Sequence, residues 1–403
     1  MTIVHPIEQA WITSGGTGAQ NYDEFADDAE ITAVIEANPA SALAIEMPHR
    51  APENLGTTFA DSLPDAVRRL THAKDQGRYL SAEDVVVLYR ISESGSAAKA
   101  PTYGMFCLVE TAQISTRADE PGLVIRNEDV FIEKVRERVA LAEATGHLLS
   151  PVLLMQTGAG RELQEALAAA CEAAGPPAAT DMDPAGRKHE IWPLPAGDEA
   201  DRLRELAGGG ELVVADGNHR SLAAQIGGLS RFLAVVTTPE SLSIDPYHRL
   251  VASLPMPSDE MLERLTETGA SATSLSQPAE TPRNADLVHL YVDGASYAVT
   301  LPRQDDAPVT ERLGHALVER LLFGEVLGLD PGDKRIRYIG GDYPAAWLRG
   351  EVDQGNAAMA VLIPPVNVDD FVAVNLARQK MPRKSTWFTP KARAGLVLAQ
   401  TGD

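Results

Sequence analysis

One pentapeptide combines the residue types that phosphate chemistry uses, the DGNHR turn at residues 216–220. It follows an apolar run at residues 212–215 and precedes a helical pattern, so the sequence predicts a strand, a tight turn and a helix in succession. Backbone N–H groups at such a helix N-terminus lack intrahelical partners and face outward with the positive end of the dipole. Gly217 allows close backbone approach, while His219 and Arg220 add donors. Together these features predict a phosphate-binding turn.

The acid in this turn predicts a metal ion. A carboxylate beside a phosphate repels it unless a cation lies between them, so Asp216 predicts Mg²⁺ held by the carboxylate and by phosphate oxygens. The spacing alone also fits a plainer arrangement, in which Asp216 caps the helix and His219 and Arg220 lie on the surface.

Two further segments carry candidate groups. Glu128 lies in a polar loop after a short predicted strand and offers a carboxylate for proton transfer. Lys384, Ser385 and Thr386 combine a cation with two hydroxyls, which suits a zwitterion or a phosphate. Taken alone, both segments also fit ordinary loops, and His248 fits a structural turn as well as a substrate contact.

The elements that must position these residues mix helices and strands. Hairpins are predicted from strands 84–91 and 103–110, and from strands 287–292 and 297–301 around Asp293-Gly294. Helices are predicted over residues 61–74, 133–145, 161–174, 198–206, 312–322 and 368–377 and from residue 221. His315 is expected on the polar, solvated side of its helix. Because no long alternating βαβ series appears, the predicted class is α+β, or mixed α/β, rather than a TIM barrel or a full doubly wound sheet.

Length and charge limit the function classes. The chain has 403 residues, which predicts two or three domains. Its formal charge of −22 disfavours nucleic acid and membrane surfaces as partners. No apolar run could span a bilayer and the N-terminus lacks a signal-peptide pattern, so a cytoplasmic location is expected. Cys107 and Cys171 lie far apart in apolar settings and are expected to be buried free thiols.

Several stretches of the chain together resemble a bacterial family known as a domain of unknown function, DUF1015. The segment LVVADGNHRSLAA at residues 212–224 is similar to the family's ADGHHRY turn, and Glu128 resembles the Glu of its HE motif. The segments DPYHRLV at 245–251 and MPRKSTWFTP at 381–390 resemble the family's LPTHRLV and MPPKSTYFYP. The resemblance extends over roughly residues 21–398.

That family is similar to the ParB/sulfiredoxin superfamily, and within it to free serine kinases, which make O-phospho-L-serine from L-serine and a nucleotide. The resemblance implies a ParB/sulfiredoxin-like nucleotide-binding core at residues 116–240. An N-terminal α/β region at residues 1–115 precedes this core. A C-terminal α/β domain at residues 241–403 follows it and contributes to the substrate site.

The resemblance also implies roles for the candidate residues. Glu128 would be the general base on the serine hydroxyl, and Asp216 and His219 would complete the catalytic set. Phosphates of ATP or ADP, with Mg²⁺ at Asp216, would be bound by Gly217, Asn218, His219 and Arg220. The amino-acid acceptor would be held by Lys384, Ser385, Thr386 and His248.

Two departures leave alternatives open. Asn218 and Asn127 stand where the family has histidines, and asparagine cannot become cationic. An active kinase is favoured, with a ParB-like nucleotide-binding regulator without kinase activity as the alternative. A sulfiredoxin-like reductase is discarded because it needs a cysteine where Asn218 stands. The choice between ATP and ADP, the exact acceptor and a homodimeric state stay open.

Overall fold

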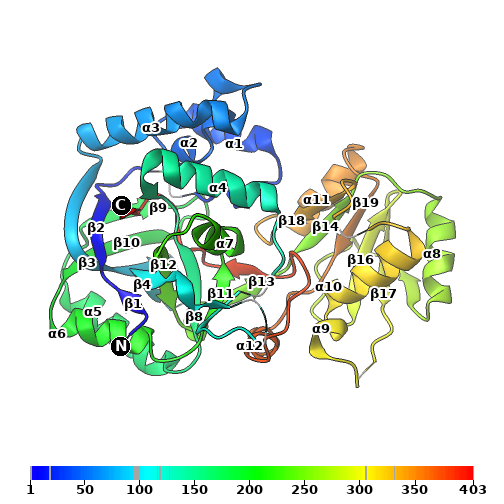
Figure 1. The fold of residues 1–403 in the computed structure, drawn as a ribbon. Coiled ribbons are helices and arrows are strands. Elements are labelled where there is room, and N and C mark those ends of the chain that lie inside the picture. Colours follow the sequence, from blue (N-terminus) through cyan, green and yellow to red (C-terminus); the bar gives the residue numbers. More distant parts are fainter. Residues whose placement is uncertain are drawn as a thin grey trace. The chain divides into compact units, whose positions relative to one another are not determined.

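The chain divides into two compact units in the computed structural model (Figure 1), residues 1–243 with 390–403, and residues 244–389. The structure describes residues 2–17, 20–93, 100–115, 117, 119–126, 128–304, 306–330 and 332–402. The mixed α/β class expected from the sequence is confirmed.

The structure differs from the predicted three-domain division. Residues 1–115 and 116–240 contribute strands to one sheet, because β12 (Arg231–Thr237) pairs with β4 (Thr102–Glu110) on one side and with β8 (Val152–Gln156) on the other. One sheet of the first unit therefore contains strands from both predicted domains. The first unit also contains residues 390–403, which the prediction had assigned to the C-terminal domain.

The first unit contains seven α-helices among its described residues. They are α1 (Asp28–Ala37), α2 (Ala42–Glu46), α3 (Phe59–Asp75), α4 (Ile132–Thr145), α5 (Gly160–Ala173), α6 (Asp198–Ala207) and α7 (Asn218–Ile226). Besides β4, β8 and β12, its strands are β1 (Val4–His5), β2 (Ile7–Thr13), β3 (Tyr79–Ser92), β5 (Ile114–Ser115), β6 (Val124–Ile125), β7 (His147–Leu148), β9 (Ala179–Met182), β10 (Lys188–Pro195), β11 (Leu212–Asp216) and β21 (Val397–Gln400).

These strands form one sheet with the order β5-β6-β11-β8-β12-β4-β3-β2-β21-β7. In addition, β1 pairs with β4, β10 pairs with β3, and β9 pairs with β10. Most neighbours are antiparallel, but β6 pairs with β11 in parallel, as β8 does with β12. The C-terminal strand β21 lies next to β2, so the two ends of the chain meet in the sheet.

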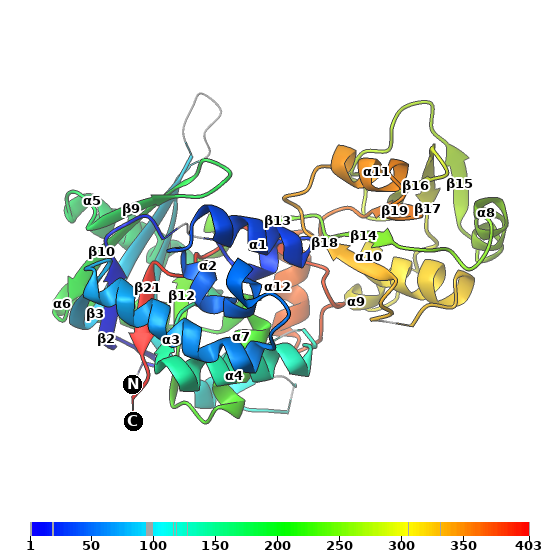
Figure 2. The ribbon, with the colours of Figure 1, turned by 90° about the horizontal axis from the view of Figure 1, so that it is seen from above.

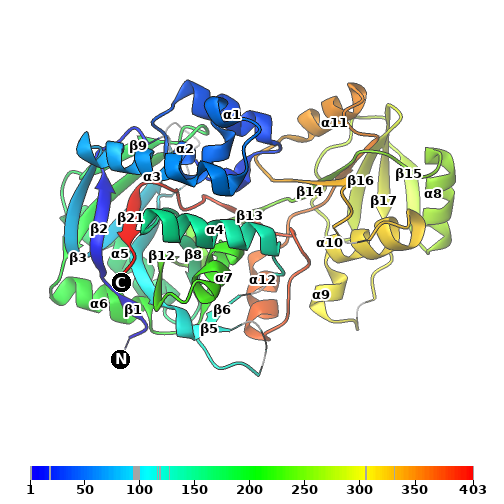
Figure 3. The same cartoon turned by 45° about the horizontal axis from the view of Figure 1, so that its top comes forward.

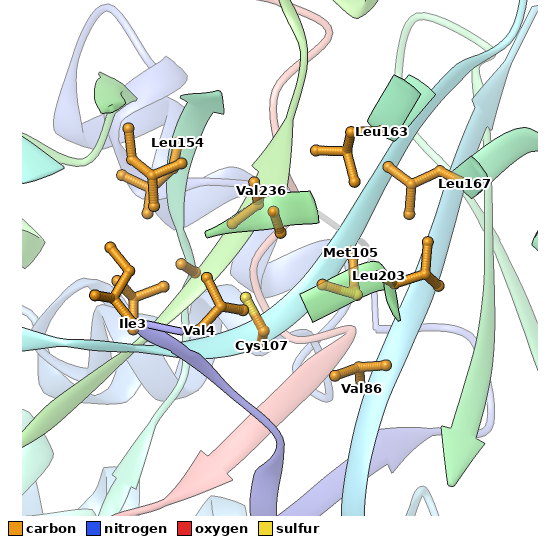
Figure 4. Close-up of a cluster of buried hydrophobic side chains, with 14 of the residues drawn as sticks. Ile3, Val4, Val86, Met105, Cys107, Leu154, Leu163, Leu167, Leu203 and Val236 are labelled. Carbon is orange, nitrogen blue, oxygen red and sulfur yellow. The ribbon is translucent and has the colours of Figure 1, made fainter. Parts of the chain in front are cut away.

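Apolar side chains pack α5 and α6 onto this sheet. Figure 4 shows Leu163, Leu167 and Leu203 from these helices near Met105 and Cys107 of β4, and all five are buried. A separate apolar cluster joins α3 and α4, which lie side by side in Figure 2. Both cysteines are buried free thiols, as expected. Among the described residues, no helix is both long and apolar enough to cross a membrane.

The second unit is built around a six-stranded sheet with the order β15-β17-β16-β19-β14-β18. Its strands are β13 (Ser243–Asp245, which starts one residue before the unit), β14 (His248–Val251), β15 (Ser271–Ser274), β16 (Leu287–Val292), β17 (Ala295–Thr300), β18 (Ile336–Ile339), β19 (Met359–Leu362) and β20 (Trp387–Thr389). Its helices are α8 (Ser258–Glu267), α9 (Val309–Arg312), α10 (Gly314–Leu317), α11 (Ala345–Asp353), α12 (Val368–Leu376) and a π-helix (Val318–Val326).

Both predicted hairpins are confirmed, since β3 pairs with β4 and β16 pairs with β17 in antiparallel register. The turn residues Asp293 and Gly294 have φ values of 50° and 73°, the left-handed conformation that a two-residue type I′ turn requires. The single helix predicted over residues 312–322 is instead broken into α9, α10 and the π-helix.

The prediction for His315 is wrong. This side chain is fully buried, and its Nε2 lies 3.0 Å from the carbonyl oxygen of Tyr247. Burial lowers the pKa of His315 well below its usual range, so the ring is neutral and Nε2 carries the proton that it donates. The charged neighbours Arg312 and Glu319 in the sequence suggested a solvated face, but the break at Leu313 changes the helical phase on which that prediction depended.

Candidate functional site

Two parallel strands bring Glu128 and the 216–220 turn to one edge of the first unit's sheet. Strand β6 pairs with β11 in parallel, with Val124 opposite Leu212. Because neighbouring parallel strands end at the same edge, the loop after β6 and the turn after β11 emerge together, where open α/β sheets commonly bind ligands. Glu128 is half-buried and lies three residues after the end of β6.

A hydrogen bond joins these two loops directly. The backbone N–H of Phe131 donates to Nε2 of His219 over 3.1 Å, and the two rings stack with centroids 6.2 Å apart. Phe131 is the N-cap residue of α4, which then runs beside α7 (Figure 3). The His219 side chain therefore fixes the start of α4 and the loop that carries Glu128 relative to the turn.

The turn has a conformation that requires glycine. Gly217 has a φ of 97° and is the N-cap residue of α7, with no side-chain cap hydrogen bond. A Cβ atom there would lie 3.1 Å from Nε of Arg220 and 3.2 Å from the Cα of Val152. The helix starts at Asn218, three residues earlier than the sequence predicted. Residues 218–220 therefore lie in its first turn, and their backbone N–H groups are those of the helix N-terminus.

Asp216 does not cap this helix, so that alternative is wrong. Its Oδ2 accepts a hydrogen bond of 2.8 Å from Nη2 of Arg220, and Nη1 of Arg220 donates to the carbonyl oxygen of Pro151. Burial opposes the charge on the guanidinium, but the nearby carboxylates of Asp216 and Asp23 outweigh it and raise the pKa of Arg220. Arg220 is thus a permanent cation that is held within the protein.

A lysine from the C-terminal segment completes this cluster. Nζ of Lys391 lies 3.7 Å from Oδ1 of Asp216 and 3.6 Å from Oδ1 of Asp23, and Lys391 is only 5% exposed. Sequence reasoning missed both residues. The position of each residue in the sequence could have marked it as a candidate. Lys391 directly follows the MPRKSTWFTP segment, and Asp23 falls in the N-terminal loop.

Glu46 is a second titratable group that the sequence did not single out. It is 2% exposed, and the hydroxyl of Ser150 donates to its Oε1. Burial raises the pKa of Glu46 to about 7, although the positive charges of Arg138 and Arg220 oppose the rise. The carboxyl therefore exchanges protons near neutral pH.

The residues around Asp216 do not fit a magnesium site in this arrangement. Among the described residues, no group of three or more His, Cys, Asp or Glu side chains could hold a metal ion. Mg²⁺ is commonly held by one or two carboxylates together with substrate phosphates and water. However, each oxygen of Asp216 already faces a cation, Arg220 or Lys391.

The other candidates belong to the second unit. Both ring nitrogens of His248 have partners, since Nδ1 accepts from the backbone N–H of Ile363 over 3.1 Å and Nε2 lies 3.2 Å from the Thr281 hydroxyl oxygen. Burial, with help from the charge of Arg249, lowers the pKa of His248 to about 3. His248 is the first residue of strand β14, so it does not lie in the turn that the sequence offered as one alternative, and its predicted contact with the acceptor stays a prediction.

Lys384, Ser385 and Thr386 form the approach to β20. Lys384 has a φ of 52°, and its Nζ lies 5.6 Å from the ring centroid of Tyr247. Ser385 is fully buried and its hydroxyl has no hydrogen-bond partner in the structure. Their predicted contact with the acceptor stays a prediction.

The sequence of this chain matches a known family. The model of the DUF1015 family, described as a protein of unknown function, matches residues 17–321, so this chain belongs to that family. No curated protein matches the chain.

Solved structures with a similar fold include a free serine kinase in complex with AMP, at 12% sequence identity and a TM-score of 0.41, with 72% of this chain and 92% of that chain covered. A conserved hypothetical protein from Pyrococcus furiosus is similar at 12% identity and a TM-score of 0.40, with 72% and 93% covered. SbnI from Staphylococcus aureus, truncated at its C-terminus, is similar at 15% identity and a TM-score of 0.40, with 72% and 85% covered.

Proposed function

We propose that this protein is a small-molecule kinase that transfers a phosphoryl group from ATP or ADP to the hydroxyl of free L-serine or a related hydroxy amino acid. The observation that carries this proposal is the parallel pairing of β6 with β11, which places the Glu128 loop and the DGNHR turn at one sheet edge. The hydrogen bond from Phe131 to His219 supports it, because it holds the two loops in a fixed relation. The acceptor class follows from the family resemblance of the motifs.

In the proposed reaction the turn binds the nucleotide phosphates. The N–H groups of the first turn of α7 and the positive end of its dipole face the anionic chain, and Gly217 lets the backbone come close. Lys391 adds a positive charge beside the turn. Arg220 acts mainly by holding Asp216, because both of its terminal nitrogens already donate within the protein. Direct contact of Arg220 or His219 with phosphate stays a prediction.

Glu128 supplies the proton acceptor. Its carboxylate takes the hydroxyl proton of the amino acid while that oxygen forms a bond to the terminal phosphorus. The bond from this phosphorus to the bridging oxygen breaks, and the shortened nucleotide leaves with the electron pair. His219 acts as a positioning residue in addition to its predicted catalytic role, since its ring fixes the loop that carries Glu128. In this reaction Asp216 pairs with Arg220 and Lys391 and does not bind Mg²⁺.

Phosphorus NMR tests the proposal. The purified protein is incubated with ATP or ADP, Mg²⁺ and L-serine, L-threonine or L-homoserine, and a phosphomonoester signal is expected for at least one acceptor. A general base contributes about 10²–10⁴-fold in rate, so Glu128→Gln should lose that factor while still binding nucleotide. Glu133→Gln is the matched control, because Glu133 is an exposed residue of α4. Absence of product with every acceptor, under conditions where nucleotide binds, would end the kinase proposal.

The same experiment distinguishes the second candidate, a nucleotide-binding regulator without kinase activity. The ion pairing of Asp216 favours this alternative, because a carboxylate neutralised by Arg220 and Lys391 is a poor metal ligand. Such a regulator would bind nucleotide with the same dependence on the turn but would release no phosphorylated product.

A further inference from the structure

A pocket in the first unit begins at Arg220 of the phosphate-binding turn and extends beyond the edge that the proposed function uses. It has a cavity volume of about 150 Å³ and lies between α4 and α7. Both helices begin at the site edge, whereas the pocket follows them as far as Glu143, near the end of α4, and Gly227, after the end of α7. It therefore extends away from the predicted phosphate site.

The walls of the pocket are mainly apolar. Val139 and Ala142 of α4, Ala223 of α7 and Leu229 and Phe232 from the segment that leads into β12 contribute to the lining. A concave apolar pocket with a few convergent polar groups is the usual form of a small-molecule site. Such walls suit an aliphatic chain.

Four charged residues line this pocket, the exposed Glu143 near the end of α4 and, from less exposed positions, Glu46, Arg138 and Arg220. Arg138 is 8% exposed, and neither its Nε nor its Nη1 has a hydrogen-bond partner in the structure. Oε2 of Glu46 also lacks one. Unpaired buried polar atoms cost free energy, and their convergence on one pocket points to a polar group that is brought by a ligand.

The charge balance determines which polar group fits. Of the two guanidinium groups, Arg220 is already paired with Asp216, so Arg138 is the buried cation left for a ligand. Of the two carboxyls, Glu143 is exposed, whereas Glu46 is buried, and because its pKa is about 7 it is partly protonated at neutral pH. A protonated carboxyl donates a hydrogen bond to an anion, and an arginine donates two. The ring of Tyr22, 4.5 Å from the Arg138 guanidinium, supports one face of that cation. An anionic oxygen pair complements this end better than a cation or an uncharged hydroxyl.

We propose that this pocket binds a small aliphatic monocarboxylate, with its carboxylate at Arg138 and Glu46 and its chain between α4 and α7. The seven steps from Arg220 to Gly227 correspond to about 10 Å at 1.5 Å per step, close to the length of an extended acyl chain of about eight carbons. Octanoate is therefore the probe. Because Arg220 both lines the pocket and holds Asp216, an occupant contacts a residue of the phosphate-binding turn.

Isothermal titration calorimetry on the full chain tests this site without reference to activity. Octanoate is expected to bind with a Kd on the order of 1 mM or tighter, which is usual for a ligand of this size. Octan-1-ol and octylamine should bind at least about tenfold more weakly, since they lack the anionic group. Equal binding of the three compounds, or no binding of octanoate, would overturn the proposal.

Two matched variants of α4 locate the site. Ala142→Leu fills the pocket from a half-exposed position and should weaken octanoate binding at least about tenfold. Ala140→Leu makes the same change on the same helix at a position outside the lining and should leave binding unchanged. Circular dichroism establishes that both variants fold. Equal binding by folded Ala142→Leu and wild type would place octanoate elsewhere and refute the proposed site.

Discussion

Replacing Gly217 with alanine tests whether the geometry of the turn is as restrictive as the structure indicates. The residue has a φ of 97°, where an L-residue is strained by about 1–2 kcal/mol. The new Cβ would also lie 3.2 Å from the backbone Cα of Val152, which cannot move as a side-chain tip can. Crowding of this kind typically costs about 1–3 kcal/mol. Gly217→Ala should therefore lower the free energy of unfolding by about 2–5 kcal/mol.

Gly228 provides the matched control on the other end of the same helix. It also has a positive φ, 67°, but a Cβ there meets no atom within 4 Å. Gly228→Ala should then show the conformational cost alone, about 1–2 kcal/mol. Urea unfolding followed by far-UV circular dichroism measures both variants.

The difference between the two variants isolates the crowding at the turn. Gly217→Ala should also weaken nucleotide binding, whereas Gly228→Ala should not, because only the former displaces the N–H groups of residues 218–220. Equal stability of the two variants together with unchanged nucleotide affinity would refute the account of the turn.

Three further predictions concern the buried charges and thiols of the first unit. Arg393→Met should destabilise the fold by about 3–5 kcal/mol in urea titrations at pH 7, because it leaves the buried Glu24 without its ion-pair partner and removes one of the two arginines that pair with Asp183, the other being Arg187. A loss below about 1 kcal/mol would contradict this. Because the pKa of Glu46 in the folded state is raised to about 7, the folded state retains a proton that the unfolded state loses, and the free energy of unfolding falls as pH rises from about 4.5 to 7. This fall should be smaller in Glu46→Gln, and identical pH profiles of the variant and the wild type would exclude the effect. Burial raises the pKa of both cysteine thiols to about 12, so neither should react with iodoacetamide at pH 8 until the protein unfolds, as mass spectrometry would show, and rapid labelling of the native chain would contradict their burial.

The sequence was sufficient to predict those elements whose structure depends on neighbouring residues in the chain. The helix predicted over residues 133–145 is confirmed as α4, which ends at Gly146 with a φ of 63°. The strand, turn and helix around residues 212–226 were also predictable, apart from the exact start of α7. Each of these features depends on residues that are close together in the chain.

The remaining features depend on contacts between distant segments. The ion pair of Lys391 with Asp216 joins residues 175 positions apart (391 − 216 = 175), and no local pattern indicates it. The pairing of β6 with β11 likewise required the whole sheet, because many other strands could have been neighbours of β11. The sequence therefore identified Glu128 and the turn as candidates through family resemblance, while their shared edge emerges only in the folded chain.

Hydrogen–deuterium exchange with and without nucleotide tests the central claim most directly. If the shared edge binds the polyphosphate, saturating ADP or ATP should slow exchange in peptides that cover both residues 128–135 and residues 216–221. Peptides from the second unit's sheet, such as residues 287–300, provide the internal reference. Nucleotide binding that leaves both edge peptides unchanged would contradict the claim that the DGNHR turn and the Glu128 loop form one phosphate site.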